Sequence, residues 1–145
     1  MNHRKFSQKM IVKIEQDDIT TRHMIKNTLI QAKEAISIKE TEVAEENMFD
    51  DRIKKYESIL SHLRVILDEI NTAVTSKEIF YRIAKKDEAI VDRIIALNVV
   101  MQSQANEFCA VARGDADIVN LNEKYEKLRN TFLERQNLFL NAKII

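Results

Sequence analysis

The sequence predicts an all-α fold, an elongated bundle of three to four long antiparallel helices with coiled-coil packing. Proline is absent and glycine occurs once in 145 residues, so the residues that form most tight turns are nearly missing. Charged residues make up 32% of the chain, which is typical of long helices. Apolar residues recur at alternating spacings of three and four, which indicates supercoiling against a partner helix. The length fits one domain, residues 1–145.

The first helix is expected over residues 4–47. Its apolar residues fall into an early and a later group: Phe6, Met10 and Ile14, then Ile25, Leu29, Ala32, Ile36 and Val43. The polar patch between the groups contains Asp17, Asp18, Thr20 and Thr21. This patch is either a break with a new N-cap or a polar layer inside one helix. We favour the continuous helix.

The second helix is expected over residues 50–74, after a turn at residues 47–51 in which Asp50 or Asp51 is the cap. Every position of its stripe is apolar: Phe49, Ile53, Tyr56, Leu60, Leu63, Leu67, Ile70 and Val74. The boundary at Thr75 and Ser76 is ambiguous, because Ser76 is a plausible N-cap but nothing there forbids helix. The second and third helices are therefore either separate or one rod.

The third helix is expected over residues 76–113. Its stripe is Phe80, Ile83, Ile90, Ile94, Leu97, Met101, Phe108 and Val111, with Asp87 and Gln104 as interruptions. Its middle is apolar over a wider arc that adds Val91, Ile95, Val99 and Val100. A wide apolar arc usually has neighbours on two sides, so we expect this helix to be central.

The fourth helix is expected over residues 117–142. Gly114 closes the third helix, and Asp115 or Asp117 caps the fourth. Its stripe is Ile118, Leu121, Tyr125, Leu128, Phe132, Phe139 and Ala142, with Arg135 as the one break. Polar residues on apolar stripes, here Asp18, Asp87, Gln104 and Arg135, tend to fix the register of packed helices. We expect a dimer or a hetero-assembly.

Charge and cysteine content narrow the function classes. The chain has 23 basic and 23 acidic residues, so it has no overall electrostatic attraction to nucleic acid. No apolar run reaches the roughly 18 residues of a membrane-spanning helix, and no apolar core of a secretory signal follows the basic N-terminus. The single cysteine, Cys109, excludes an internal disulfide and favours a reducing compartment, the cytoplasm.

A bound metal or cofactor is not expected. Di-iron bundles need Glu-x-x-His motifs, which are absent, and Cys109 has no neighbouring ligands for zinc. His3 lies in a terminus expected to fray. His62 is next to Leu63 in the second helix and is interpreted as a residue at the edge of its apolar stripe. Cys109 is interpreted as a small buried apolar residue. No Gly-rich phosphate loop or Gly-x-Ser-x-Gly motif is present.

One segment carries a resemblance to a known family. Residues 22–29 read Arg-His-Met-Ile-Lys-Asn-Thr-Leu, which resembles the phospho-accepting box of sensor histidine kinases. The resemblance implies that His23 accepts a phosphoryl group on a dimeric four-helix bundle and passes it to an aspartate of a response regulator. A chain with one glycine cannot form the kinase's glycine-rich lid, so it implies a stand-alone phosphotransfer bundle. The other interpretation, which we favour, is a surface histidine on a helix.

The functional expectation is a non-catalytic interaction module: a scaffold, an assembly subunit, or a helical chaperone or adaptor. Helical faces bind other helices, whereas catalytic groups usually lie on loops, which are scarce here. The expected partners are other helical proteins or a second copy, docked on apolar stripe left uncovered, most of it on the first helix. The alternatives are phosphotransfer through His23 and attachment to a membrane surface through the basic N-terminal segment. The acidic residues at 40–51 either dock a basic partner or form a solvated helix end.

Overall fold

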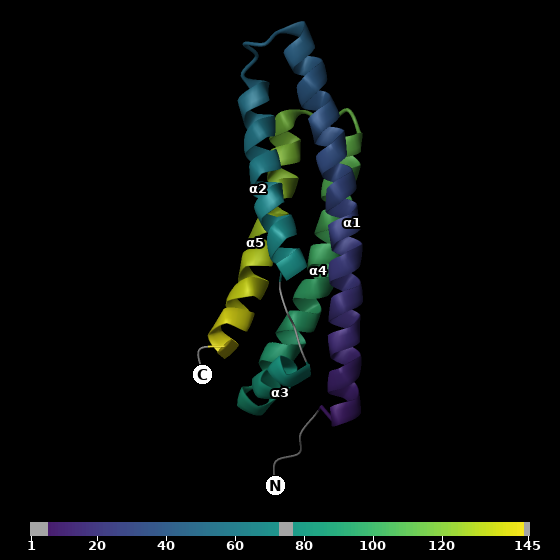
Figure 1. Cartoon of the computed structure of the whole chain (residues 1–145), viewed down its shortest axis with the longest axis vertical. Helices are drawn as coiled ribbons and strands as arrows, with labels where there is room; N and C mark the ends of the chain where they lie inside the picture. Colours follow the sequence, from purple (N-terminus) through teal and green to yellow (C-terminus); the bar gives the residue numbers. More distant parts are fainter. Residues whose placement is uncertain (1–5, 73–76, 144–145) are drawn as a thin grey trace.

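The chain is all-α. The computed structural model describes residues 6–72 and 77–143, which contain five helices and no strand. The helices are α1 (Gln8–Glu46), α2 (Arg52–Thr72), α3 (Lys77–Lys86), α4 (Glu88–Arg113) and α5 (Ile118–Lys143). They pack against one another in an elongated molecule, with α1 running along most of its length (Figure 1). No described helix combines the length and hydropathy that crossing a membrane would require.

The first helix is continuous, as expected. It begins at Gln8, later than the predicted residue 4, because the Ser7 hydroxyl caps it by accepting a 3.2 Å hydrogen bond from the Met10 N–H. Residues 4 and 5 lie outside the described part. The helix runs through Asp17 and Thr21 without a break, so the polar patch is a layer within one helix.

The turn between α1 and α2 follows the prediction, and Asp50 is its cap. The Asp50 carboxylate accepts a 2.9 Å hydrogen bond from the Arg52 N–H and also pairs with the Arg52 guanidinium. These hydrogen bonds lower the pKa of Asp50 to about 2. Phe49, predicted to begin the buried stripe of α2, lies in the turn and is 86% exposed. That part of the stripe prediction was wrong.

The helix predicted over residues 76–113 is two helices. Asp87 separates α3 from α4 with an extended backbone, and its carboxylate caps α4 by accepting a 3.0 Å hydrogen bond from the Ala89 N–H. Asp87 is thus a helix boundary and not a polar position on a stripe. Val74, Thr75 and Ser76 lie outside the described residues, so the expected boundary between the second and third helices does too.

The turn before α5 confirms the predicted caps. The Gly114 N–H donates to the carbonyls of Ala110 and Val111 at the end of α4. Asp117, rather than Asp115, caps α5 by accepting a 2.8 Å hydrogen bond from the Asn120 N–H. The predicted stripe of α5 is buried from Ile118 to Phe139, Arg135 included. The side chain of Ala142 lies outside the described part.

Two separate apolar clusters form the core. The larger cluster joins α1, α2, α4 and α5, and includes Ile25, Leu29, Leu63, Met101 and Phe132. The smaller cluster joins α1, α3, α4 and α5, and consists of Phe6, Ile11, Phe80, Ile83, Val91, Ile94 and Phe139. Helices α1, α4 and α5 therefore contribute to both clusters, while α2 and α3 each contribute to one.

The buried stripe of α4 differs from the predicted one. The residues that face the core are Val91, Ile94, Leu97, Asn98, Met101, Ala105, Phe108, Cys109 and Ala112. Gln104 and Val111, which the prediction placed on the stripe, are only half-buried. The prediction followed the larger apolar side chains, whereas the core here accepts two alanines where neighbouring helices come close.

Candidate functional site

A buried layer of polar side chains lies between the two apolar clusters. We call Asp18, Arg22, Asn98 and Arg135 the polar layer. Asp18 follows Ile11 of the smaller cluster and precedes Ile25 of the larger one. Asn98 and Arg135 are likewise flanked on α4 and α5 by residues of both clusters. The polar layer therefore lies at the level of the core where α3 replaces α2 as the fourth packed helix.

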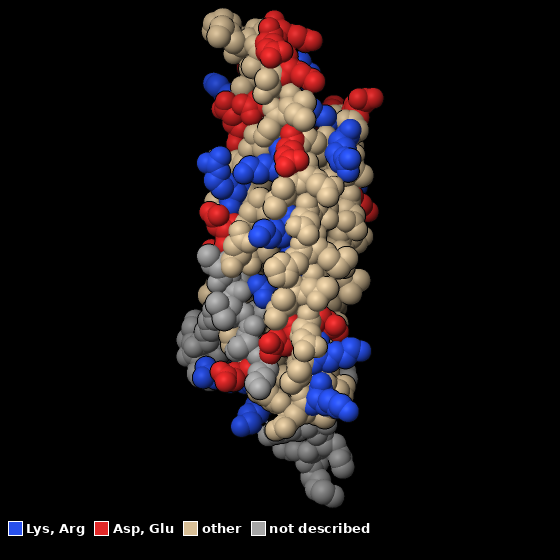
Figure 2. All heavy atoms as spheres, turned by 45° about the vertical axis from the view of Figure 1, so that its right-hand side comes forward, with Lys and Arg blue, Asp and Glu red and all other residues tan. Residues whose placement is uncertain are grey.

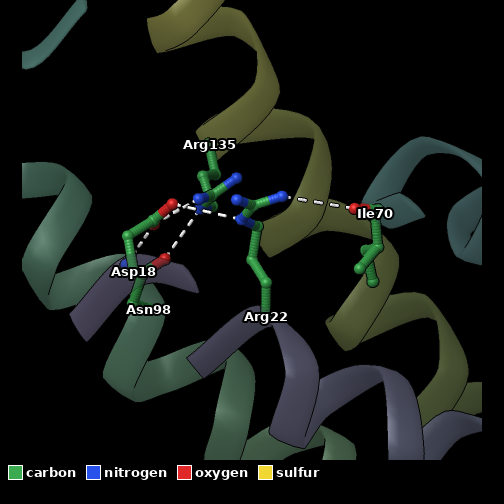
Figure 3. A network of polar contacts seen from close by, with 5 residues as sticks. All are labelled: Asp18, Arg22, Ile70, Asn98 and Arg135. Atoms are coloured by element: carbon green, nitrogen blue, oxygen red, sulfur yellow. Dashed lines mark hydrogen bonds and ion pairs between the residues drawn. The ribbon is translucent and has the colours of Figure 1, made fainter. Parts of the chain in front are cut away.

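Asp18 is the centre of the polar layer (Figure 3). Its carboxylate is 1% exposed and accepts hydrogen bonds from the Asn98 amide at 2.8 Å, from the Arg22 Nε at 3.2 Å and from Arg135 Nη2. Arg135 also donates to the Asn98 side-chain carbonyl at 2.7 Å and stacks on the Phe139 ring. A buried carboxylate is tolerated only with such pairing.

Arg22 connects the polar layer to α2. Its Nη1 donates to the carbonyl oxygen of Ile70 at 3.3 Å, and Figure 3 shows the guanidinium between Asp18 and that carbonyl. Ile70 lies in the last turn of α2, where carbonyl groups have no partner within their helix. Arg22 thus donates a hydrogen bond to a carbonyl group at the end of α2 and also forms an ion pair with Asp18. The layer joins four helices, and its polar atoms are directed at one another.

The layer was partly predicted from the sequence. Asp18 and Arg135 were identified as polar interruptions of apolar stripes, and both are buried. Asn98 was not identified, although it lies between Ile94 and Met101 at spacings of four and three. An asparagine at an otherwise apolar core position is the signal that would have found it.

The three candidate residues singled out by type lie apart from this layer. His23 is exposed on α1, while Ile25 and Leu29 are buried, as the sequence indicated. His62 is exposed and stacks on Tyr125, with ring centroids 5.9 Å apart. Cys109 is buried and free, which confirms its interpretation as a core residue. In the described segments, no three His, Cys, Asp or Glu side chains gather closely enough to hold a metal ion.

The basic N-terminal segment and the acidic residues at 40–51 lie at the two ends of α1. Phe6 and Ile11 of the basic N-terminal segment are buried against α3, α4 and α5, whereas Met10 and Val12 of the same segment are exposed. Glu42, Glu45 and Glu46 are exposed at the end of α1, and acidic side chains gather at the upper end of Figure 2. Burial and the nearby Glu57 raise the pKa of Glu40.

The outward side of α4 carries uncharged, exposed surface. No Asp, Glu, Lys or Arg occurs between Arg93 and Glu107, although such residues make up 32% of the chain. Val99 is 67% exposed, and Val100 and Ile95 are also exposed. We call the exposed residues along this side of the helix the α4 outer face: Ala89, Asp92, Arg93, Ala96, Val99, Val100, Ser103, Asn106, Glu107 and Ala110. The wide apolar arc of this helix is thus only partly covered by the chain.

A groove adjoins the α4 outer face. It has a volume of about 330 Å³ and is lined by residues of α1 and α4, among them Ile14, Thr20, Thr21, Ile95 and Val99. Asp18 and Asn98 of the polar layer also line it. Figure 2, which brings the α1 side of the molecule forward, shows a broad area of uncharged side chains at mid-height. The first helix was expected to carry most of the exposed apolar surface, and α4 carries exposed apolar residues as well.

No protein-family model matches the chain, and no curated protein or solved structure matches it either.

Proposed function

We propose that this chain is a non-catalytic interaction module that binds the apolar face of another helix on the α4 outer face. The observation that carries this proposal is the exposure of Val99 and Val100 in a stretch of α4 without charged residues. Contiguous exposed apolar surface is a feature of protein-binding sites, and a helical face is a natural acceptor for a partner helix. The partner is expected to be an amphipathic helix with small or apolar residues at heptad spacing.

The internal packing supports a rigid scaffold for such a face. We infer that the helices form an antiparallel, heptad-packed bundle whose register is set by the polar layer. Buried stripe residues at spacings of three and four, such as Leu121, Tyr125, Leu128 and Phe132, favour coiled-coil packing. A buried polar layer disfavours shifted registers, since a shift of α1 against α4 or α5 would separate Asp18 from Asn98 or Arg135.

Replacing Val99 by Asp tests the interaction. The change places a charge in the middle of the uncharged stretch between Arg93 and Glu107, and we expect it to reduce capture of partner proteins from native cell extract at least about tenfold. The measurement is an affinity pull-down with partners quantified by mass spectrometry. The matched control is Val65→Asp, because Val65 is 59% exposed on α2. Equal capture of the same helical partners by both variants would contradict the proposal.

Phosphotransfer through His23 is a second candidate. One observation favours it: His23 is exposed while Ile25 and Leu29 are buried, so its imidazole is accessible to a partner's active site. The N–P bond would form at an imidazole nitrogen as the O–P bond of the donor's aspartyl phosphate breaks and its carboxylate leaves.

His23→Ala tests this candidate. If His23 is the acceptor, incubation with a phosphorylated response-regulator receiver domain labels the wild-type chain and leaves His23→Ala unlabelled, with helicity unchanged by circular dichroism. His62→Ala is the control, because His62 is also exposed on a helix. Equal labelling of wild type and His23→Ala, or of neither, would exclude the role.

A further inference from the structure

We propose that the helix bound on the α4 outer face is α4 of a second copy of this chain, running antiparallel about a twofold axis near Val99 and Val100. This inference rests on the proposed function and names its partner. A twofold interface brings the same patch of both copies together, so the patch must complement itself. The α4 outer face meets that requirement in its spacing, its side-chain sizes and its charges.

The α4 outer face is symmetric in sequence about its two valines. Ala96 lies three positions before Val99, and Ser103 lies three positions after Val100. Ala89 and Ala110 lie ten positions outside the same pair. Two antiparallel copies would therefore place Ala96 opposite Ser103 of the second copy, and Ala89 opposite its Ala110. Each valine would face a valine of the other copy.

The side chains suit close packing of two helices. Ala89, Ala96, Ser103 and Ala110 recur every seven residues, which keeps them on one side of a helix in a coiled coil. All four are exposed. The distance between packed helices depends on the side chains at the contact, and small residues permit a short distance. Val99 and Val100 would then become buried at the centre of the interface.

The charges at the ends of the face favour the antiparallel direction. Arg93 lies seven positions before Val100 and Glu107 seven positions after it. An antiparallel partner brings Arg93 beside Glu107 of the second copy, whereas a parallel partner brings like charges together. Arg93 already pairs with Glu134, and Glu107 with Lys124, so each end would carry a row of alternating charges. Two copies also do not repel, because the net charge of the chain is zero.

The mass in solution is the first test. Sedimentation or light scattering should give twice the chain mass of 16.9 kDa. Val99→Asp should weaken dimerisation at least about 100-fold, because symmetry introduces the charge twice. Helicity should not change, since Val99 is exposed. Val119→Asp is the control: Val119 is 61% exposed on α5, outside this face. A wild-type chain that stays monomeric at high concentration would overturn the inference.

Cysteine cross-linking tests the direction. A disulfide requires Cα atoms about 4.4–6.8 Å apart. A mixture of tagged Ala89→Cys and untagged Ala110→Cys should cross-link on mild oxidation, while neither variant alone should. Wild type controls for Cys109, which is buried. Cross-linking of each variant with itself would show a parallel dimer and overturn the inference.

The two proposals fail in different ways. A monomeric wild type whose extract partners are lost in Val99→Asp would retain the proposed function and remove the second copy as its partner. A dimer disrupted by Val99→Asp, with unchanged extract partners, would confirm the dimer and exclude the face as a binding site for other proteins.

Discussion

Leu63→Asp should abolish cooperative folding. Leu63 is fully buried in the larger apolar cluster, among residues of α1, α4 and α5. An aspartate there would be an unpaired charge in an apolar environment, or it would bind a proton and become a buried neutral carboxyl. Either state lowers the free energy of unfolding by several kcal/mol. Small proteins have only about 5–15 kcal/mol of unfolding free energy in total. The expected result is loss of a cooperative thermal transition by circular dichroism.

Val65→Asp is the matched control for this prediction. It makes the same substitution in the same helix, two positions further on, where the side chain is exposed. Surface substitutions of this kind usually change stability by about 0.5 kcal/mol or less. A Leu63→Asp variant with wild-type helicity and a wild-type melting transition would show that the larger cluster does not hold the fold together.

The sequence predicted helices well because their apolar stripes are long and regular. The stripe of α5 was identified from Ile118 to Phe139 and is buried with its one polar member, Arg135. The break at Asp87 was missed because aspartate is ambiguous there. It can interrupt a stripe or cap a new helix, and the choice depends on whether α3 must turn to reach the core.

Side-chain size misled the prediction for α4. Ile90 and Val111 looked more suitable for the core than Ala105 and Ala112, yet the alanines are buried and the larger residues are half-buried. A helix surrounded closely by others needs small residues where backbones approach. Periodicity alone does not report that distance, because it depends on the neighbouring helices. The same uncertainty hid the exposure of Val99 and Val100.

The polar layer explains why two apolar clusters coexist in one elongated chain. Where α2 ends and α3 takes its place, the core changes its fourth helix, and the last turn of α2 exposes carbonyl groups to the interior. Arg22 satisfies one of them through Ile70 and is itself neutralised by Asp18. The layer thus places polar groups where the backbone needs them. It also separates two sections of core whose stabilities are expected to respond differently to mutation.

Asp18→Ala is therefore expected to be among the most damaging single substitutions outside the apolar core. It removes the shared acceptor of Asn98, Arg22 and Arg135. Arg135 is 5% exposed, so its charge would remain buried without its carboxylate. Breaking a buried ion pair from one side costs about 3–5 kcal/mol. Urea denaturation should show this loss, with Asp17→Ala, an exposed neighbour, changing stability by about 0.5 kcal/mol or less.

Replacing the three buried members of the polar layer, Asp18, Asn98 and Arg135, should have the opposite consequence. The triple variant Asp18→Leu, Asn98→Leu and Arg135→Met removes both charges of the buried Asp18–Arg135 ion pair. Replacing a buried ion pair by apolar residues often leaves the free energy of unfolding unchanged or raises it by about 1–4 kcal/mol. If the layer sets the register, the stable triple variant should show broadened amide resonances, since slipped packings become accessible. A triple variant as unstable as Asp18→Ala would mean that the layer contributes net stability. Sharp resonances in a stable variant would mean that the apolar stripes alone fix the register.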